Sequence, residues 1–168
     1  MSTSFEEKTT LFENWKGGAF FSDDRKYRYM LWRHWDPYKP KAVFIMLNPS
    51  TADEKVNDPT IERCLRRAAK MGFGKMEVLN LFAFRATDPK KLKVEPEPIG
   101  LLNDQWIWLR SGMASAVFIA WGNHGSYLNR STEVLKILWG LNVPVYHFGK
   151  TKSAERSLRC RHRRRRAG

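Results

Sequence analysis

Three short, mostly apolar runs, separated by segments with helical spacing, constrain the fold of this chain more than any other feature. They cover residues 42–47, 76–82 and 116–121, and continuous apolar stretches of this length are typical of strands buried on both faces. Between the first two runs, Asp58-Pro59 is a preferred helix start, and apolar residues then recur at helical spacing from Ile61. Strands that alternate with helices predict a mainly parallel sheet with crossover helices on both faces.

The remaining segments extend this plan. Residues 18–22 and 27–34 alternate apolar with polar side chains around a polar turn, which predicts an antiparallel hairpin at one edge of the sheet. A long loop is expected over 86–98, further helices near 101–110 and 132–139, and a last strand over 143–148. The sequence therefore predicts the α/β class, as a three-layer α/β/α domain with a mainly parallel central sheet and an antiparallel edge hairpin.

Length and charge divide the chain into a domain and a tail. A chain of 168 residues is too short for two domains of ordinary size, so we expect one α/β domain over 1–152. Of the net charge of +13, residues 150–168 supply +8, which leaves +5 for 1–149. This balance favours a polyanionic partner. Residues 153–168 form an arginine-rich tail that we expect to be disordered, either as a native nucleic-acid-binding arm or as the product of a frameshift.

Composition and missing motifs exclude several classes of protein. Two cysteines far apart indicate a reducing compartment, and no apolar run approaches the ~20 residues of a membrane span. We therefore expect a cytoplasmic location and no membrane partner, while the oligomeric state stays open. The chain has no phosphate-binding P-loop, no GxGxxG, no HExxH and no paired CxxC. We accordingly expect neither a cofactor nor a metal.

Polar residues follow each apolar run, at the edge of the sheet where ligands bind in folds of this kind. The candidate catalytic residues are Asn48, Asp53 and His124. The candidate substrate-binding residues lie near the ends of the second and third runs or shortly after them: Asn80, Arg85, Thr87, Trp121, Gly122 and Asn123. Each also has an ordinary structural interpretation, because Asn48 and His124 fit turns, Arg85 fits a solvated charge, and Trp121 fits the core.

Basic residues supply candidate contacts with nucleic-acid phosphates. Three of them lie on the outer face of the helix expected after Pro59, and two follow in the long loop: Arg63, Arg66, Arg67, Lys90 and Lys91. Phosphate contacts of this kind provide most of the sequence-independent affinity for nucleic acid.

Several longer strings resemble a known family. Residues 44–53 (FIMLNPSTAD), 57–64 (NDPTIERC), 78–89 (VLNLFAFRATDP), 120–125 (AWGNHG) and 149–152 (GKTK), with Asn103-Asp104 between them, are similar to a bacterial and phage family catalogued as domain of unknown function number 1643. The resemblance covers roughly residues 20–152 and implies no particular activity.

A more distant resemblance implies a chemistry. Asn-Pro after the first core strand, an Asn after the next and a Gly after the third resemble the uracil-DNA glycosylase superfamily, and imply its fold. Carried over, Asn48 orients the attacking water and Asn80 contacts a flipped base. The sequence departs from that pattern in two places. Ser50 stands where the glycosylase motif has Gly, and no His-Pro dipeptide is present.

Three functions therefore stay open. The first is a nucleobase- or nucleic-acid-recognising protein that hydrolyses an N-glycosidic bond. The second is a non-catalytic nucleic-acid-binding module, and the third is an enzyme acting on a free nucleotide or nucleoside. The expected partner is nucleic acid, with DNA favoured over RNA, or a nucleotide.

Overall fold

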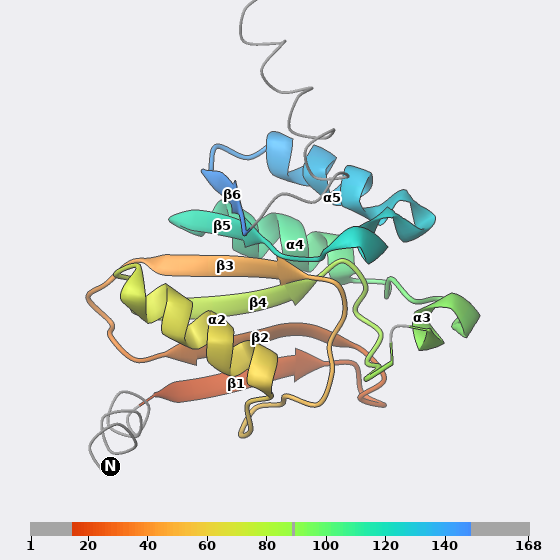
Figure 1. The fold of residues 1–168 in the computed structure, drawn as a ribbon, viewed down its shortest axis with the longest axis horizontal. Coiled ribbons are helices and arrows are strands. Elements are labelled where there is room, and N and C mark those ends of the chain that lie inside the picture. The colour runs from red at the N-terminus through yellow and green to blue at the C-terminus, as the bar shows by residue number, and fades with distance from the viewer. Residues whose placement is uncertain (1–14, 89, 149–168) are drawn as a thin grey trace, which may run out of the picture.

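The apolar runs form the centre of a six-stranded mixed sheet in the computed structural model, which describes residues 15–88 and 90–148 (Figure 1). The strands are β1 (Lys16–Phe21), β2 (Arg28–His34), β3 (Lys41–Met46), β4 (Lys75–Asn80), β5 (Ala116–Ile119) and β6 (Val145–His147). Their order across the sheet is β1-β2-β4-β3-β5-β6. The strands β4, β3, β5 and β6 are parallel, whereas β2 runs antiparallel to both of its neighbours. The predicted α/β class and the edge hairpin are confirmed.

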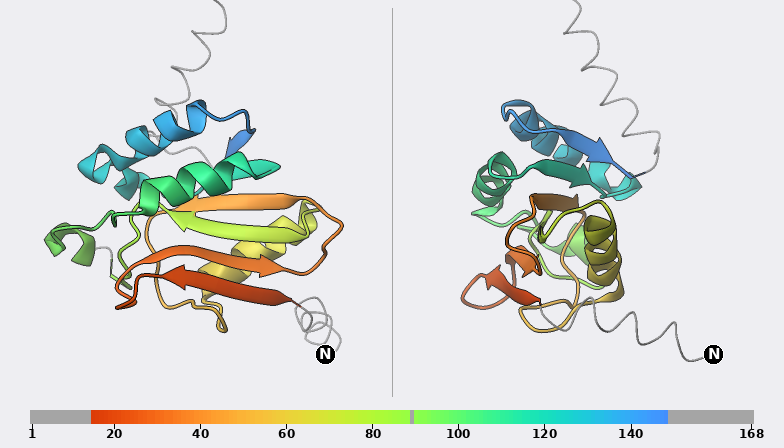
Figure 2. Two further views of the ribbon diagram at one scale, coloured as in Figure 1. Left: turned by 180° about the vertical axis from the view of Figure 1, so that it is seen from behind. Right: turned by 90° about the vertical axis from the view of Figure 1, so that its left-hand side faces the viewer.

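Helices cover both faces of the sheet (Figure 2). The first, α2 (Pro59–Lys70), lies on one face, and α4 (Asn103–Gly112) and α5 (Arg130–Trp139) lie on the other. The Asp58 carboxylate caps α2 by accepting hydrogen bonds from the backbone N–H groups of Thr60 and Ile61, both at 2.9 Å. This is the start that the Asp-Pro pair predicted.

Two apolar cores lie on opposite faces of the sheet, because successive side chains of a strand point to opposite sides. Phe44 and Val78 pack with Leu65 of α2. Val43 and Leu79 belong to the core that contains residues of α4 and α5. No helix in the described part of the chain is long and apolar enough to cross a membrane.

The structure adds two short elements that the sequence pattern did not predict. The helix α3 (Lys91–Val94) lies inside the expected loop 86–98, where Leu92 is buried and anchors it. A 3-10 segment, Asn123–Asn129, precedes α5. The expected tail, 153–168, and the end of the expected domain lie outside the described residues.

A buried ion cluster ties the sheet to α4. Glu77 of β4 is 1% exposed, and its carboxylate accepts a hydrogen bond from Nζ of Lys41 at 3.1 Å. It also accepts two hydrogen bonds from the guanidinium of Arg110 on α4, through Nε at 2.9 Å and through Nη2. One carboxylate therefore compensates two cations at the boundary between sheet and helix.

His34 gives the fold a specific pH dependence. Burial lowers the pKa of this half-buried side chain, and the charges of Lys75, Lys41 and Arg110 add to the effect against that of Glu77. Because the pKa in the folded state lies below the value of about 6.5 in the unfolded chain, the unfolded state binds more protons in acid. We expect the stability that depends on neutral His34 to be complete above pH ~6.5 and to fall as the pH drops below it.

Urea unfolding between pH 5 and 8 checks this expectation. The His34→Gln variant should lose part of the acid-side slope of the wild type. The exposed His124→Gln is the matched control and should keep the full slope. If the unfolding free energy of His34→Gln falls with acid as steeply as that of the wild type, the pH dependence does not come from His34.

Candidate functional site

A basic pocket of about 450 Å³ opens beyond the carboxyl ends of β3 and β4. It lies among the turn between β1 and β2, the loops that follow β3 and β4, and α3. Its lining holds four cationic side chains, three hydroxyl side chains and two apolar ones: Arg25, Lys26, Arg85, Lys91, Ser50, Thr51, Thr87, Phe84 and Ala86. Among the residues that the structure describes, no carboxylate lines the pocket. Cations and hydroxyl groups together suit an anion such as a phosphate.

The positive charge of the pocket is only partly compensated. Arg25 forms an ion pair with Glu54 at 2.9 Å, and Lys26 forms one with Glu95 at 2.8 Å. Within the described ranges, neither Arg85 nor Lys91 has a carboxylate partner. These two side chains supply the charge that attracts an anion.

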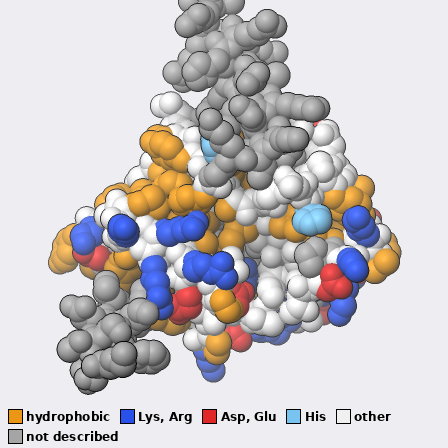
Figure 3. Space-filling model, viewed as in Figure 1, with side chains coloured by type: hydrophobic (Ala, Val, Ile, Leu, Met, Phe, Trp, Pro, Cys, Tyr) orange, Lys and Arg blue, Asp and Glu red, His pale blue; other side chains and the backbone are white. Residues whose placement is uncertain are grey.

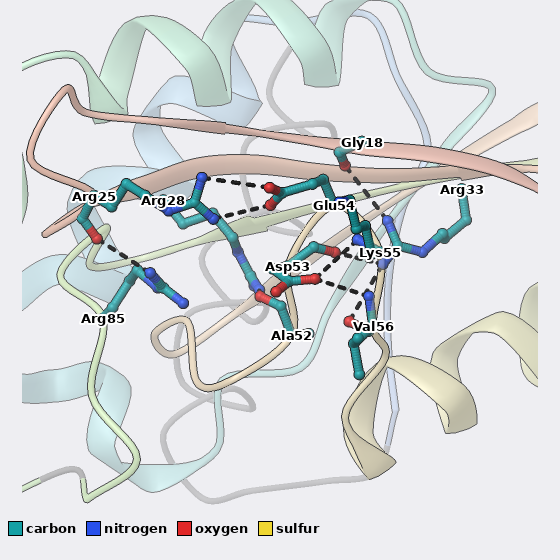
Figure 4. A network of polar contacts seen from close by, with 10 residues as sticks. All are labelled: Gly18, Arg25, Arg28, Arg33, Ala52, Asp53, Glu54, Lys55, Val56 and Arg85. Carbon is teal, nitrogen blue, oxygen red and sulfur yellow. Dashed lines mark hydrogen bonds and ion pairs between the residues drawn. The ribbon is translucent and has the colours of Figure 1, made fainter.

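Arg85 is held in place by its surroundings (Figure 4). Its Nη1 donates a hydrogen bond to the backbone oxygen of Arg25 at 3.2 Å, and its guanidinium lies 4.8 Å from the centre of the Phe21 ring. Its Nε is buried and has no hydrogen-bond partner among the described residues. A guanidinium that is held in place and has N–H donors without an acceptor is suited to binding a planar or tetrahedral oxyanion.

Asn48 joins the two loops behind this pocket. Its Nδ2 donates hydrogen bonds to the backbone oxygens of Pro49 at 3.0 Å and of Ala86 at 2.7 Å. The backbone N–H of Ala86 in turn donates to the oxygen of Pro49 at 2.9 Å. Two carbonyl acceptors fix the orientation of the amide, and Oδ1 has no donor among the described residues. This oxygen is therefore free to accept a hydrogen bond from a water or from a base N–H.

Two arginines of β2 anchor the loop between β3 and α2. Arg28 is 1% exposed and donates from Nη1 to the oxygen of Ala52 at 2.7 Å, and Arg33 donates from Nη2 to the oxygen of Asp53 at 2.6 Å. Burial lowers the pKa of each guanidinium to about 10, so both stay charged at neutral pH. Both reach carbonyl oxygens of the loop (Figure 4). They hold the loop in place next to the basic pocket.

Asp53 and Asn80 occupy positions that differ from those of the pocket residues. The Asp53 carboxylate accepts hydrogen bonds from the backbone N–H groups of Lys55 and Val56, both at 2.8 Å, and these bonds lower its pKa. It stabilises the turn of its own loop. Asn80 is buried, and no residue in the described part of the chain forms a hydrogen bond with its Nδ2. By strand alternation its side chain shares a face with Val78, on the α2 side of the sheet.

The candidate residues that follow β5 do not line the pocket. Trp121 is buried in the core beneath α4 and α5, where it packs so closely on Gly125 that a Cβ there would clash with its ring. Gly122, Asn123 and His124 are exposed at the start of the 3-10 segment, and Gly122 has a φ of 65°. The structure thus brings Arg85, Thr87 and Lys91 together beside Asn48, and leaves the group after β5 apart from them.

The remaining basic candidates lie on two helices. Arg63, Arg66 and Arg67 are exposed on α2, outside the pocket lining, and Lys90 is exposed next to Lys91 at the start of α3. Arg67 is placed with its guanidinium over the ring of Phe148, 4.9 Å from the ring centre.

Sequence reasoning missed the two cations of the hairpin turn. Arg25 and Lys26 reach the pocket because β2 pairs with β4 in the antiparallel sense, which brings the turn before β2 to the carboxyl end of β4. The predicted hairpin carried no information on which strand it pairs with. Ser50 and Thr51 belong to the motif that follows β3, but no pattern in the sequence set them apart as lining residues.

Comparisons with known proteins identify a family and no activity. A family model described as "Protein of unknown function (DUF1643)" matches residues 28–157, which include the loops that follow β3 and β4. No curated protein and no solved structure matches the chain.

Proposed function

Because the chain belongs to the DUF1643 family, whose function is unknown, we propose a function from its own residues: it binds a phosphate-bearing nucleobase compound, either nucleic acid or a nucleotide. The observation that carries the proposal is the pocket beyond β3 and β4, whose described lining residues include four cations and three hydroxyl groups and no carboxylate. A phosphate there contacts Arg85 and Lys91, the two cations of the pocket that have no acidic partner within residues 15–88 and 90–148. Asn48 does not itself line the pocket but bonds to the lining residue Ala86, and from there it offers Oδ1 to the edge of a base.

The order of the motifs along the sheet supports a fold similar to that of the uracil-DNA glycosylase superfamily. Asn48-Pro49 follows β3 and Asn80 ends β4, and these two strands are parallel neighbours. In α/β sheets of this kind the ligand lies beyond the carboxyl ends of the parallel strands. The basic pocket lies at that edge.

A comparison of nucleotides with nucleosides tests the phosphate subsite. We expect calorimetry to show that nucleoside monophosphates bind at least about tenfold more tightly than the matching nucleosides, with an affinity that falls as salt rises. Lys91→Ala should weaken nucleotide binding about fivefold, because a partly exposed ion pair contributes up to about 1 kcal/mol. Lys93→Ala is the matched control on the same helix. Lys93 is exposed outside the pocket lining, and its variant should bind like the wild type.

Equal affinities for nucleotide and nucleoside would refute the phosphate subsite. So would a Lys91→Ala variant that binds the nucleotide as tightly as the wild type.

The geometry of Asn48 favours a second, catalytic candidate. Its amide is fixed by two backbone carbonyls, and no described residue donates a hydrogen bond to Oδ1. A water held there attacks C1′ of the sugar. A C–O bond forms, the bond from C1′ to the base nitrogen breaks, the base leaves with the electron pair and is protonated, and the water loses its proton to solvent. Flipping a base out of a duplex costs a few kcal/mol, which the phosphate contacts offset.

We expect Asn48→Ala to lower base excision by about a hundredfold, the range typical of a lost water-positioning group. Alkaline cleavage of oligonucleotides that carry uracil or modified bases measures the effect. The melting temperature is recorded in parallel, because the variant also removes one hydrogen bond within the loop after β3, to Pro49, and one to the loop after β4, at Ala86. Asn142→Ala, at an exposed position outside the pocket lining, is the control and should keep full activity. If the wild type releases no base from any substrate, the enzyme candidate fails, whereas the binding function is judged by the nucleotide titrations.

A further inference from the structure

Four aromatic rings with nearly parallel planes pack against one another on the α2 side of the sheet. This aromatic stack consists of Phe44 of β3, Phe118 of β5, Tyr146 of β6 and Phe148 directly after β6. The ring centres of Phe118 and Tyr146 are 5.5 Å apart at an interplanar angle of 25°, and those of Phe118 and Phe148 are 5.2 Å apart at 14°. Phe44 and Phe148 are 5.9 Å apart at 9°. The rings are close to parallel, which is the arrangement in which a further flat ring can be added.

Burial differs between the inner and the outer rings of the aromatic stack. Phe44 and Phe118 are buried in the core beneath α2, whereas Tyr146 is 53% exposed and Phe148 is 36% exposed. The buried rings support the exposed ones from below and fix their orientation. Aromatic side chains have few rotatable bonds, so a ligand that stacks on these rings costs little side-chain conformational entropy.

Positive charge lies directly beside this surface. The guanidinium of Arg67 lies over the Phe148 ring, 4.9 Å from its centre. The exposed face of α2 carries four basic side chains, namely Arg63, Arg66, Arg67 and Lys70. Lys and Arg side chains gather over α2, beside exposed apolar side chains (Figure 3). Glu62, the acidic residue of α2, is half-buried and accepts a hydrogen bond from Asn57.

We propose that the aromatic stack and the basic face of α2 bind single-stranded nucleic acid. The inference deepens the proposed function, on which it rests, by naming the kind of nucleic acid. Unpaired bases stack on Tyr146 and on the Arg67 guanidinium, and the phosphates contact the basic side chains of α2. A duplex does not fit this surface, because its base faces are stacked on one another. A second copy of the chain does not fit either, because two such rows of cations repel each other.

Fluorescence anisotropy with the full chain and a labelled 15-nucleotide single strand tests the surface. Tyr146→Leu keeps an apolar side chain but removes the ring face, and should weaken binding of the single strand about tenfold, the usual effect of losing one stacked base. Arg67→Gln should weaken binding of the single strand. It should also reduce the slope of the logarithm of the binding constant against the logarithm of the salt concentration by about 1, the value for one phosphate contact. Trp108→Leu and Lys136→Gln are the matched controls, since both residues are exposed on helices of the opposite face. They should bind like the wild type.

Three results would overturn the inference. The first is a Tyr146→Leu variant that binds the single strand as tightly as the wild type, and the second is a wild type that binds the same sequence more tightly as a duplex. The third is sedimentation that shows a wild-type dimer and a monomeric Tyr146→Leu variant. Nucleotide titrations keep this inference separate from the proposed function. Tyr146→Leu should bind nucleotides normally, because Tyr146 is outside the pocket lining. Single-strand binding that depends on Tyr146 in a chain that ignores nucleotides would support the surface while refuting the pocket.

Discussion

Replacing Glu77 by alanine is expected to lower the free energy of unfolding by about 3–5 kcal/mol, the usual effect of removing one partner from a buried ion pair. The Glu77 carboxylate is 1% exposed and compensates both Lys41 and Arg110. Its loss leaves two cations at the boundary of sheet and α4 without their acceptor, in surroundings that solvate them poorly. Urea unfolding of the variant at neutral pH measures the change.

A surface ion pair provides the comparison. Glu133 pairs with Lys136 at 2.9 Å on the exposed side of α5, where both side chains are largely accessible to solvent. Glu133→Ala should therefore cost no more than about 0.5 kcal/mol. A loss below about 1 kcal/mol for Glu77→Ala would mean that Lys41 and Arg110 find water or other acceptors, and that the cluster does not hold α4 to the sheet.

Arg85→Gln is expected to weaken nucleotide binding about thirtyfold, because a charge-assisted hydrogen bond to a phosphate contributes about 2 kcal/mol. The Arg85 guanidinium is already ordered by Arg25 and Phe21, so little entropy is lost when an anion binds to it. The Arg85→Lys variant should bind the nucleotide more tightly than Arg85→Gln and more weakly than the wild type, since lysine keeps the charge but lacks the planar set of donors. Calorimetric titration with a nucleoside monophosphate gives both values.

The fold of each Arg85 variant is checked by its melting temperature, because Arg85 also bonds to the hairpin turn. Both variants should melt within a few degrees of the wild type. If the Arg85→Gln variant is folded and binds the nucleotide as tightly as the wild type, the phosphate does not contact Arg85. Lys91 is then the remaining cation of the pocket to test.

The centre of the fold was predictable from sequence for a simple physical reason. A strand covered on both faces has to be apolar throughout, so β3 and β5 were visible as uninterrupted runs. The start of α2 was equally local, since Asp58 and Pro59 act on their own helix. The short helix α3 was not predictable, because its stability depends on burying Leu92, which is a tertiary contact.

The candidate site was predictable only in part. The basic pocket lies at the carboxyl ends of β3 and β4, and Asn48, Arg85 and Thr87 are neighbours there because the two strands pair directly. The contributions of Arg25 and Lys26 depend on how β2 pairs, which the alternation of its residues does not encode. Arg28 shows the same limit. A register shift beside Phe20 and Phe21 offsets its pairing, and its side chain is buried against the loop that leads to α2.

The hydrogen bonds from Arg28 and Arg33 to the loop between β3 and α2 have a consequence for the behaviour of that loop in acid. Arg28 and Arg33 bond to the backbone oxygens of Ala52 and Asp53, which neither gain nor lose a proton in ordinary buffers. A fastening made with aspartate or glutamate fails in acid as those carboxylates become neutral. The backbone oxygens of Ala52 and Asp53 are not protonated in mild acid, so the two guanidinium contacts persist under those conditions.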